Sequence, residues 1–172
     1  MKIRGFNHVG ITVKNFEKAV RWYREVFGVS LISEGGLTPE RISEMKKLYN
    51  LPEGIGVKFG FLICPGGGLI EIFEFTETAP FAHCWNRPGT HHFTLDVKNI
   101  KKWYKKLSER GDVEILNTPQ RDDGADWFFF RDPDGNLIEL MDLRKNYFPI
   151  KYLSRPVGFF MRKFKFKKFY KV

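Results

Sequence analysis

The chain has 172 residues, 42% of them hydrophobic and 16% aromatic, which is sufficient for one domain with a packed core. No run approaches the ~20 consecutive apolar residues of a membrane span, and the first residues lack an apolar signal region. We therefore expect a soluble, cytoplasmic protein.

The net charge of +9 is concentrated at one end of the chain. Residues 155–172 hold seven Lys or Arg and no Asp or Glu, and subtracting these seven charges leaves +2 for residues 1–154. The body of the protein is therefore nearly neutral. No nucleic-acid partner is expected for it.

The first half of the chain predicts a strand, a helix and three further strands. Alternating apolar and polar residues mark the strands, and apolar residues at helical spacing between Asn15 and Gly28 mark the helix. The expected elements are a strand over residues 6–13, a helix over 16–27, a strand over 29–33 that Gly35 and Gly36 break, a helical insertion over 38–54, and strands over 57–64 and 69–75.

The pattern restarts after a linker over residues 76–88 that contains two prolines. The expected elements are a strand over 91–97, a helix that Asn99 caps and Gly111 ends, a strand over 113–116, a polar loop over 117–124, and hairpin strands over 127–130 and 137–141. Val-Lys-Asn ends the first strand of each half, and aligning these endings places His92 on His8. Leu-Ile-Glu likewise places Glu139 on Glu71.

The chain is thus an internal duplication of a strand-helix-strand-strand-strand unit. His8 and Glu71 are 63 residues apart, whereas His92 and Glu139 are 47 apart. The difference of 16 is close to the length of the helical insertion, so one insertion accounts for it. Glu74 competes with Glu71 for the aligned position, but the matching Leu-Ile-Glu motifs favour Glu71.

The two His and two Glu form a candidate metal-binding set. On the first strand of each half, His8 and His92 lie on the side opposite the apolar residues, so both should face away from the helix-covered core. If the two halves pair as their repetition indicates, both His and both Glu line one cleft. Two imidazoles and two carboxylates suit a divalent ion such as Zn, Ni, Co, Mn or Fe.

Three segments carry a family resemblance: Asn-His-Val-Gly-Ile-Thr-Val near the start, Trp-Tyr-Arg-Glu-Val-Phe-Gly at the end of the first helix, and Phe-Arg-Asp-Pro-Asp-Gly-Asn-Leu-Ile-Glu-Leu near residue 139. They resemble the glyoxalase, bleomycin resistance and extradiol dioxygenase superfamily, also called vicinal oxygen chelate (VOC) proteins. The resemblance implies an α+β fold in which two tandem βαβββ modules form a curved mixed sheet around a metal cleft. It predicts a single VOC domain over residues 1–143, with module one over about 3–78, module two over about 88–143, and a C-terminal tail over 144–172.

The resemblance also implies chemistry. His8, Glu71, His92 and Glu139 match the metal-ligand positions, and Glu139 and Glu71 become the candidate catalytic bases. The preferred hypothesis is a glyoxalase I-like lyase or an epimerase-like isomerase that stabilises an enediolate of a small oxygenated substrate on a divalent metal. One alternative is an Fe(II) extradiol dioxygenase, which Glu71 argues against because it fills a coordination position. The other is a non-catalytic binding or resistance protein.

Partners and peripheral residues follow from the same reasoning. A small-molecule substrate and a homodimer are expected, and the site lies either within one chain or between two. Arg121 and Arg131 are interpreted as surface charges rather than as substrate contacts. The C-terminal tail has three interpretations: its aromatics pack on the body or on a partner subunit, which is preferred, or the tail contacts an anionic membrane surface, or it binds polyanions.

Overall fold

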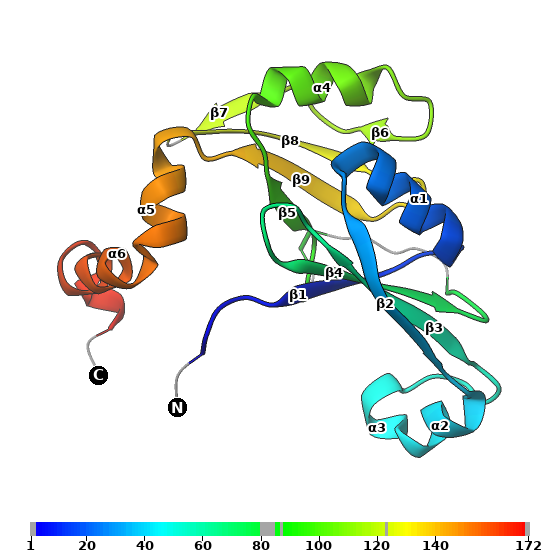
Figure 1. The fold of residues 1–172 in the computed structure, drawn as a ribbon. Coiled ribbons are helices and arrows are strands. Elements are labelled where there is room, and N and C mark those ends of the chain that lie inside the picture. Colours follow the sequence, from blue (N-terminus) through cyan, green and yellow to red (C-terminus); the bar gives the residue numbers. More distant parts are fainter. Residues whose placement is uncertain (1–2, 80–84, 87, 123, 171–172) are drawn as a thin grey trace. The chain divides into compact units, whose positions relative to one another are not determined.

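The computed structural model describes residues 3–79, 85–86, 88–122 and 124–170 (Figure 1). The expected linker over 76–88 lies partly outside these residues. The chain forms two compact units: Met1–Gly89 with Asp134–Asn136, and Thr90–Pro133 with Leu137–Val172. Each unit contains one sheet.

The first unit contains a four-stranded mixed sheet in the order β1-β4-β3-β2. Its first strand is parallel to β4, and the other neighbours are antiparallel. The elements are β1 (His8–Thr12), α1 (Phe16–Phe27), β2 (Ser30–Leu37), α2 (Pro39–Glu44), α3 (Lys46–Tyr49), β3 (Val57–Ile63) and β4 (Leu69–Phe75). The predicted strand, helix and three strands are therefore present, with two short helices in the insertion.

Strand β2 runs through both glycines, so the predicted break at Gly35 and Gly36 is wrong. The backbones approach closely here, because a Cβ on Gly36 would lie 3.0 Å from the carbonyl oxygen of Val57. A Cβ on Gly35 would lie 3.1 Å from the ring of Phe59. Glycine is needed for this close approach and does not end the strand.

The second unit repeats the arrangement with the strand order β5-β9-β8-β6, and β7 pairs with the free part of β8. Strand β5 is parallel to β9, as β1 is to β4. The elements are β5 (Phe93–Asp96), α4 (Ile100–Ser108), β6 (Glu114–Ile115), β7 (Gln120–Asp122), β8 (Ala125–Arg131) and β9 (Leu137–Asp142). The α+β fold of two βαβββ modules is confirmed, with one mixed sheet in each module.

Strand β7 replaces part of the predicted polar loop over 117–124. Its three residues are all exposed and polar, so the sequence carries no alternation that would reveal a strand. Arg121 lies directly opposite Asp126 in the ladder and donates two hydrogen bonds to its carboxylate, at 2.6 and 3.1 Å. The pairing of β7 with β8 is therefore stabilised by a cross-strand charge pair and not by burial of apolar side chains.

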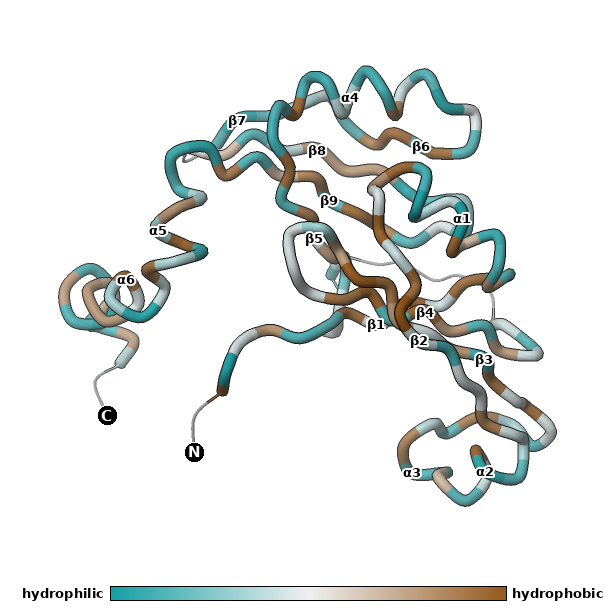
Figure 2. Tube along the Cα trace, in the orientation of Figure 1, coloured by the Kyte–Doolittle hydropathy of each residue, from teal (hydrophilic) through white to brown (hydrophobic). Residues whose placement is uncertain are grey.

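Each sheet has one face covered by its helix, and the core of each unit lies there. Helix α1 contacts β2, β3 and β4, and α4 contacts β8 and β9. Figure 2 shows hydrophobic stretches along β4, β8 and β9. The fully buried side chains on the helix-covered side are Phe16, Tyr23, Leu62, Ile70 and Ile72 in the first unit, and Leu107, Phe128, Phe130, Ile138 and Leu140 in the second.

The C-terminal tail is helical. It contains η1 (Arg144–Asn146), α5 (Tyr147–Tyr152), α6 (Ser154–Phe160), the π-helical turn η2 (Met161–Lys165) and η3 (Lys167–Phe169). Among the described residues, no helix combines the length and the apolar character needed to cross a membrane.

Candidate functional site

The first unit brings His8 and Glu71 together on the sheet face away from α1. Nε2 of His8 lies 3.3 Å from Oε2 of Glu71, and the Glu71 side chain is 15% exposed. Nδ1 of His8 lies 2.8 Å from Oδ1 of Asn7. Nδ1 of His8 thus faces Asn7, and Nε2 is the nitrogen directed at Glu71.

The second unit brings His92 and Glu139 together in the same way. Nε2 of His92 lies 3.5 Å from Oε2 of Glu139, and the Glu139 residue is only 7% exposed. A carboxylate this deeply buried requires compensating positive charge or hydrogen bonds. Each half of the chain therefore brings one of the predicted histidines next to one of the predicted glutamates.

The two pairs occupy equivalent places in the two sheets. Glu71 lies opposite Phe61 in the β3–β4 ladder, and Glu139 lies opposite Phe129 in the β8–β9 ladder. Each phenylalanine meets its histidine edge to face, with ring centroids 5.6 Å apart in the first unit and 5.0 Å in the second. In each unit, a phenylalanine on the equivalent neighbouring strand, β3 or β8, thus packs against the histidine of the pair.

These two phenylalanines were not among the predicted site residues, although the sequence contains a signal for them. Phe61 precedes Glu71 by ten residues, and Phe129 precedes Glu139 by the same ten. Equal spacing within an internal repeat predicts equivalent positions, and even spacing in a hairpin is compatible with a shared face.

One difference distinguishes the two pairs. Thr94 is the ladder partner of Glu139, and its hydroxyl donates a 2.6 Å hydrogen bond to Oε2 of that carboxylate. The corresponding partner of Glu71 is Gly10, which has no side chain to donate. A Cβ on Gly10 would lie 3.1 Å from the Phe73 ring, so this ring occupies the space that a side chain would need.

Glu74, the rival to Glu71, has a different place and partner. Its Oε2 accepts a 2.8 Å hydrogen bond from the backbone N–H of Phe16, at the start of α1. Three residues after Glu139, Asp142 accepts a 2.9 Å hydrogen bond from the backbone N–H of Asn99, at the start of α4. The repeat thus contains a second carboxylate pair, which caps helices on the opposite face of each sheet.

The His–Glu spacing fits adjacent ligands of one metal ion. With metal–ligand bonds of about 2.1 Å, neighbouring ligand atoms lie roughly 3.0 Å apart at 90° and about 3.4 Å apart at the tetrahedral angle. The two observed spacings are 3.3 and 3.5 Å. Imidazole nitrogen and carboxylate oxygen are also the donors that divalent transition metals accept.

Among the described residues, each unit brings together one His–Glu pair. In the part of the chain that the structure describes, no three His, Cys, Asp or Glu side chains gather as metal ligands. His8 and Glu71 belong to one unit, and His92 and Glu139 belong to the other. The joining of both pairs around one ion is therefore a proposal, developed below.

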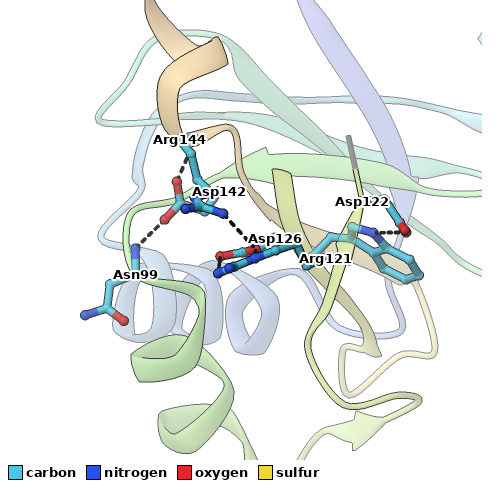
Figure 3. A network of polar contacts seen from close by, with 7 residues as sticks. Asn99, Arg121, Asp122, Asp126, Asp142 and Arg144 are labelled. Atoms are coloured by element: carbon cyan, nitrogen blue, oxygen red, sulfur yellow. Dashed lines mark hydrogen bonds and ion pairs between the residues drawn. The ribbon is translucent and has the colours of Figure 1, made fainter. Parts of the chain in front are cut away.

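Arg121 and Arg131 have structural partners, as the interpretation of surface charges requires. Figure 3 shows Arg121 and Arg144 on either side of Asp126, with closest nitrogen–oxygen distances of 2.6 and 3.7 Å. The hydrogen bond from Arg121 is the main cause that lowers the pKa of the Asp126 carboxyl below its usual value. Arg131 lies 3.4 Å from Glu114.

Comparisons with known proteins agree with this architecture. The metallothiol transferase FosB of Staphylococcus haemolyticus is 25% identical over 139 residues, which cover 80% of this chain and 83% of FosB. A glyoxalase family protein from Bacillus cereus has a TM-score of 0.65 at 20% identity, over 83% of this chain and 95% of its own. The fosfomycin resistance protein FosX from Listeria monocytogenes, solved with Mn(II) and sulfate, has a TM-score of 0.54 at 20% identity, over 82% and 93%.

The chain also matches a protein family over most of its length. Residues 5–140 match the family described as the Glyoxalase/Bleomycin resistance protein/Dioxygenase superfamily. This range contains both modules and all four predicted ligand residues, and it ends before the C-terminal tail. The chain therefore belongs to the glyoxalase, bleomycin resistance protein and dioxygenase superfamily.

Proposed function

We propose that this protein is a divalent-metal-dependent enzyme in which His8, Glu71, His92 and Glu139 together hold one ion. The observation that carries the proposal is the recurrence of one His–Glu pair in each unit, at 3.3 and 3.5 Å. Residues 1–143 form the metal-binding domain in this proposal. The four ligands come from one chain or from two chains of a homodimer.

The side chains fit the chemistry of such an ion. When bound, the ion supplies Lewis acidity that polarises substrate oxygens. In the first unit, Asn7 holds the His8 ring with Nε2 directed at Glu71, which is the orientation that a ligand requires. In the second unit, the Thr94 hydroxyl holds one oxygen of Glu139.

The carboxylates supply proton transfer. Glu139 is tethered by Thr94, whereas Glu71 faces Gly10 across the ladder, so the two carboxylates differ in freedom of movement. Either carboxylate accepts a proton from a substrate bound beside it, or returns the proton to that substrate. The phenyl rings of Phe61 and Phe129 contact the histidines and present an apolar wall to a small substrate.

The preferred reaction is that of a glyoxalase-like lyase or an epimerase-like isomerase, acting on a small oxygenated substrate. The test is turnover by protein purified without chelator and loaded separately with Mn, Zn, Ni, Co or Fe(II). A hemithioacetal should be converted if the protein is a lyase, or a 2-methyl-acyl-CoA if it is an isomerase, and His8→Ala and Glu139→Gln proteins should lose both activity and stoichiometric metal. Metal-independent turnover, or full metal content in both variants, would contradict the proposal.

A second candidate is transfer of a thiol to a small electrophile, since the relative FosB is named a metallothiol transferase. The similarity to FosB over 80% of the chain and the fold shared with the fosfomycin resistance protein FosX favour it. Fosfomycin with a panel of low-molecular-weight thiols and Mn(II) is the discriminating assay. Thiol consumption with fosfomycin, and none of the isomerase or lyase products, would establish this candidate over the first.

The homodimer is tested separately. Light scattering coupled to gel filtration should give twice the 20.2 kDa chain mass. In mixtures of His8→Ala and His92→Ala chains, a site shared between chains would recover one intact quartet per dimer. A site within one chain would recover none.

A further inference from the structure

The C-terminal tail carries charge of a single sign among large apolar side chains. Residues 154–170 contain six Lys or Arg and no acidic residue. The apolar side chains are far from buried: Phe160 and Phe164 are each 62% exposed, Phe169 is 70% exposed, and Met161 is 43% exposed. This combination lies outside the matched family range, so the proposed enzyme function does not account for it.

Four of these side chains share one face of the helix formed by α6 and η2, whereas Phe159, which is 50% exposed, lies outside that face beside Lys163. Val157, Phe160, Met161 and Phe164 stand at positions i, i+3, i+4 and i+7, which form one stripe on a helical surface. The rings of Phe160 and Phe164 lie 5.2 Å apart, which confirms that they share a face. Arg155 and Arg162, seven residues apart, share a different face. We name Val157, Phe160, Met161 and Phe164 the apolar stripe.

In the structure, the aromatic side chains of this part of the tail are not packed on the sheet of their own unit. The aromatic side chains of residues 154–170 are all exposed, by 40% to 70%. Figure 1 shows α6 standing clear of β8 and β9, which belong to the same unit. The apolar stripe thus remains available to an external surface.

We propose that the apolar stripe and the surrounding cations bind the surface of an anionic phospholipid membrane. A helix with one apolar face and a Lys- and Arg-rich remainder lies in the plane of the headgroups, with its apolar face at the acyl boundary. Anionic lipids complement the tail's uniform positive charge.

Two other partners fit less well. A second copy would bring another tail with the same positive sign and no acidic residue, so tail-to-tail association would be repulsive. A nucleic acid would pair with the cations but leave the apolar stripe in water. A membrane surface is the partner that engages both features.

The experiment measures co-sedimentation of the full chain with two kinds of vesicle: pure phosphatidylcholine, and phosphatidylcholine mixed with phosphatidylserine. The protein should bind the anionic vesicles and bind the neutral ones weakly. Phe160→Ser/Phe164→Ser protein should lose roughly tenfold or more of its affinity for anionic vesicles. Arg162→Gln/Lys163→Gln protein should bind them more weakly and with a shallower salt dependence.

Matched controls distinguish vesicle binding by the tail from nonspecific adsorption of exposed apolar residues and from misfolding. Leu48 and Leu116 are 73% and 40% exposed but lie outside the tail, so Leu48→Ser/Leu116→Ser protein should bind like wild type. All variants should keep the wild-type melting temperature, because the replaced side chains are exposed.

Two results would overturn the proposal. Undiminished vesicle binding by Phe160→Ser/Phe164→Ser protein, with binding competed away by an oligonucleotide, would instead identify a polyanion site. A smaller oligomer for that variant in light scattering without lipid would instead assign the apolar stripe to a partner subunit.

Discussion

Replacing Glu139 by Gln, with Glu74→Gln as its matched control, tests the metal assignment directly. Both glutamates lie on strands, Glu139 on β9 and Glu74 on β4, but Glu139 lies 3.5 Å from His92, whereas Glu74 accepts a hydrogen bond from the backbone N–H of Phe16. Glutamine removes the charge in each case and keeps an oxygen that can accept the local hydrogen bond. The two variants should therefore differ in metal binding and little else.

The expected increase in Tm on metal binding follows from the linkage between binding and folding. An ion present at about 100 times its Kd stabilises the folded protein by about 2.7 kcal/mol. A chain of this length gains about 2–4 °C of Tm per kcal/mol, so wild type should gain roughly 5–11 °C. Residues that only orient metal ligands change metal affinity by up to ~100-fold, so losing a ligand should weaken it by at least that factor. At the same metal concentration, the ion would then stabilise the fold by about 0.4 kcal/mol and raise the Tm by roughly 1–2 °C.

The assay is thermal unfolding of chelator-treated protein with and without added Mn(II) or Zn(II), read by circular dichroism. Wild type and Glu74→Gln should show the full increase in Tm, and Glu139→Gln should show almost none. An unreduced increase in the Glu139→Gln protein would refute the ligand assignment. Loss of the increase in Glu74→Gln would instead return Glu74 to the site and reject the choice of register.

Three further predictions follow from single contacts. Thr94→Val should weaken metal affinity by roughly 10–100-fold, measured by competition with a chromophoric chelator, because Glu139 loses the hydroxyl that holds it; unchanged affinity would contradict this role. Gly60→Ala should destabilise the fold by about 1–3 kcal/mol in urea unfolding, because its Cβ would lie 2.7 Å from the Phe16 ring and 2.8 Å from the Ser33 carbonyl oxygen; unchanged stability would show that the strands yield. Arg121→Ala should lower stability at pH 7, and the difference should vanish in acid: Arg121 lowers the folded-state pKa of Asp126, so its contribution is present above the unfolded pKa of about 4 and lost as pH falls through the lower folded value.

Much of the fold was predictable because the chain repeats itself. A lone His8 or Glu71 carries little information, but the same residue types at aligned positions in both halves identified β1 with β5 and β4 with β9. Side-chain alternation then placed both histidines on the face away from the helices, and the structure confirms this. Alternation also separates Glu71 from Glu74, since an odd spacing along a strand puts them on opposite faces.

The features that were predicted wrongly or not at all are not marked by the repeat or by side-chain alternation. Gly35 and Gly36 suggested a break from local conformational preference alone, whereas the close approach to β3 is a tertiary constraint. Strand β7 is polar throughout, and polar contacts join it to β8: the ion pair of Arg121 with Asp126 and the hydrogen bond that Trp127 donates to Asp122. The hydroxyl of Thr94 could be placed on the face of His92 by alternation, but its contact with Glu139 required the β5–β9 register.

The helix-capping carboxylates have a consequence for errors in strand pairing. A one-residue slip of β4 would turn Glu71 into the core beneath α1, and would turn Glu74 away from the Phe16 N–H that it caps. The slipped state would therefore bury an unpaired charge and also leave a helix end unsatisfied. Asp142 imposes the same double penalty on β9. In each sheet, the helix-capping carboxylate on the face opposite the site therefore disfavours the slipped register. This fixes the orientation of Glu71 and Glu139 as the strands form.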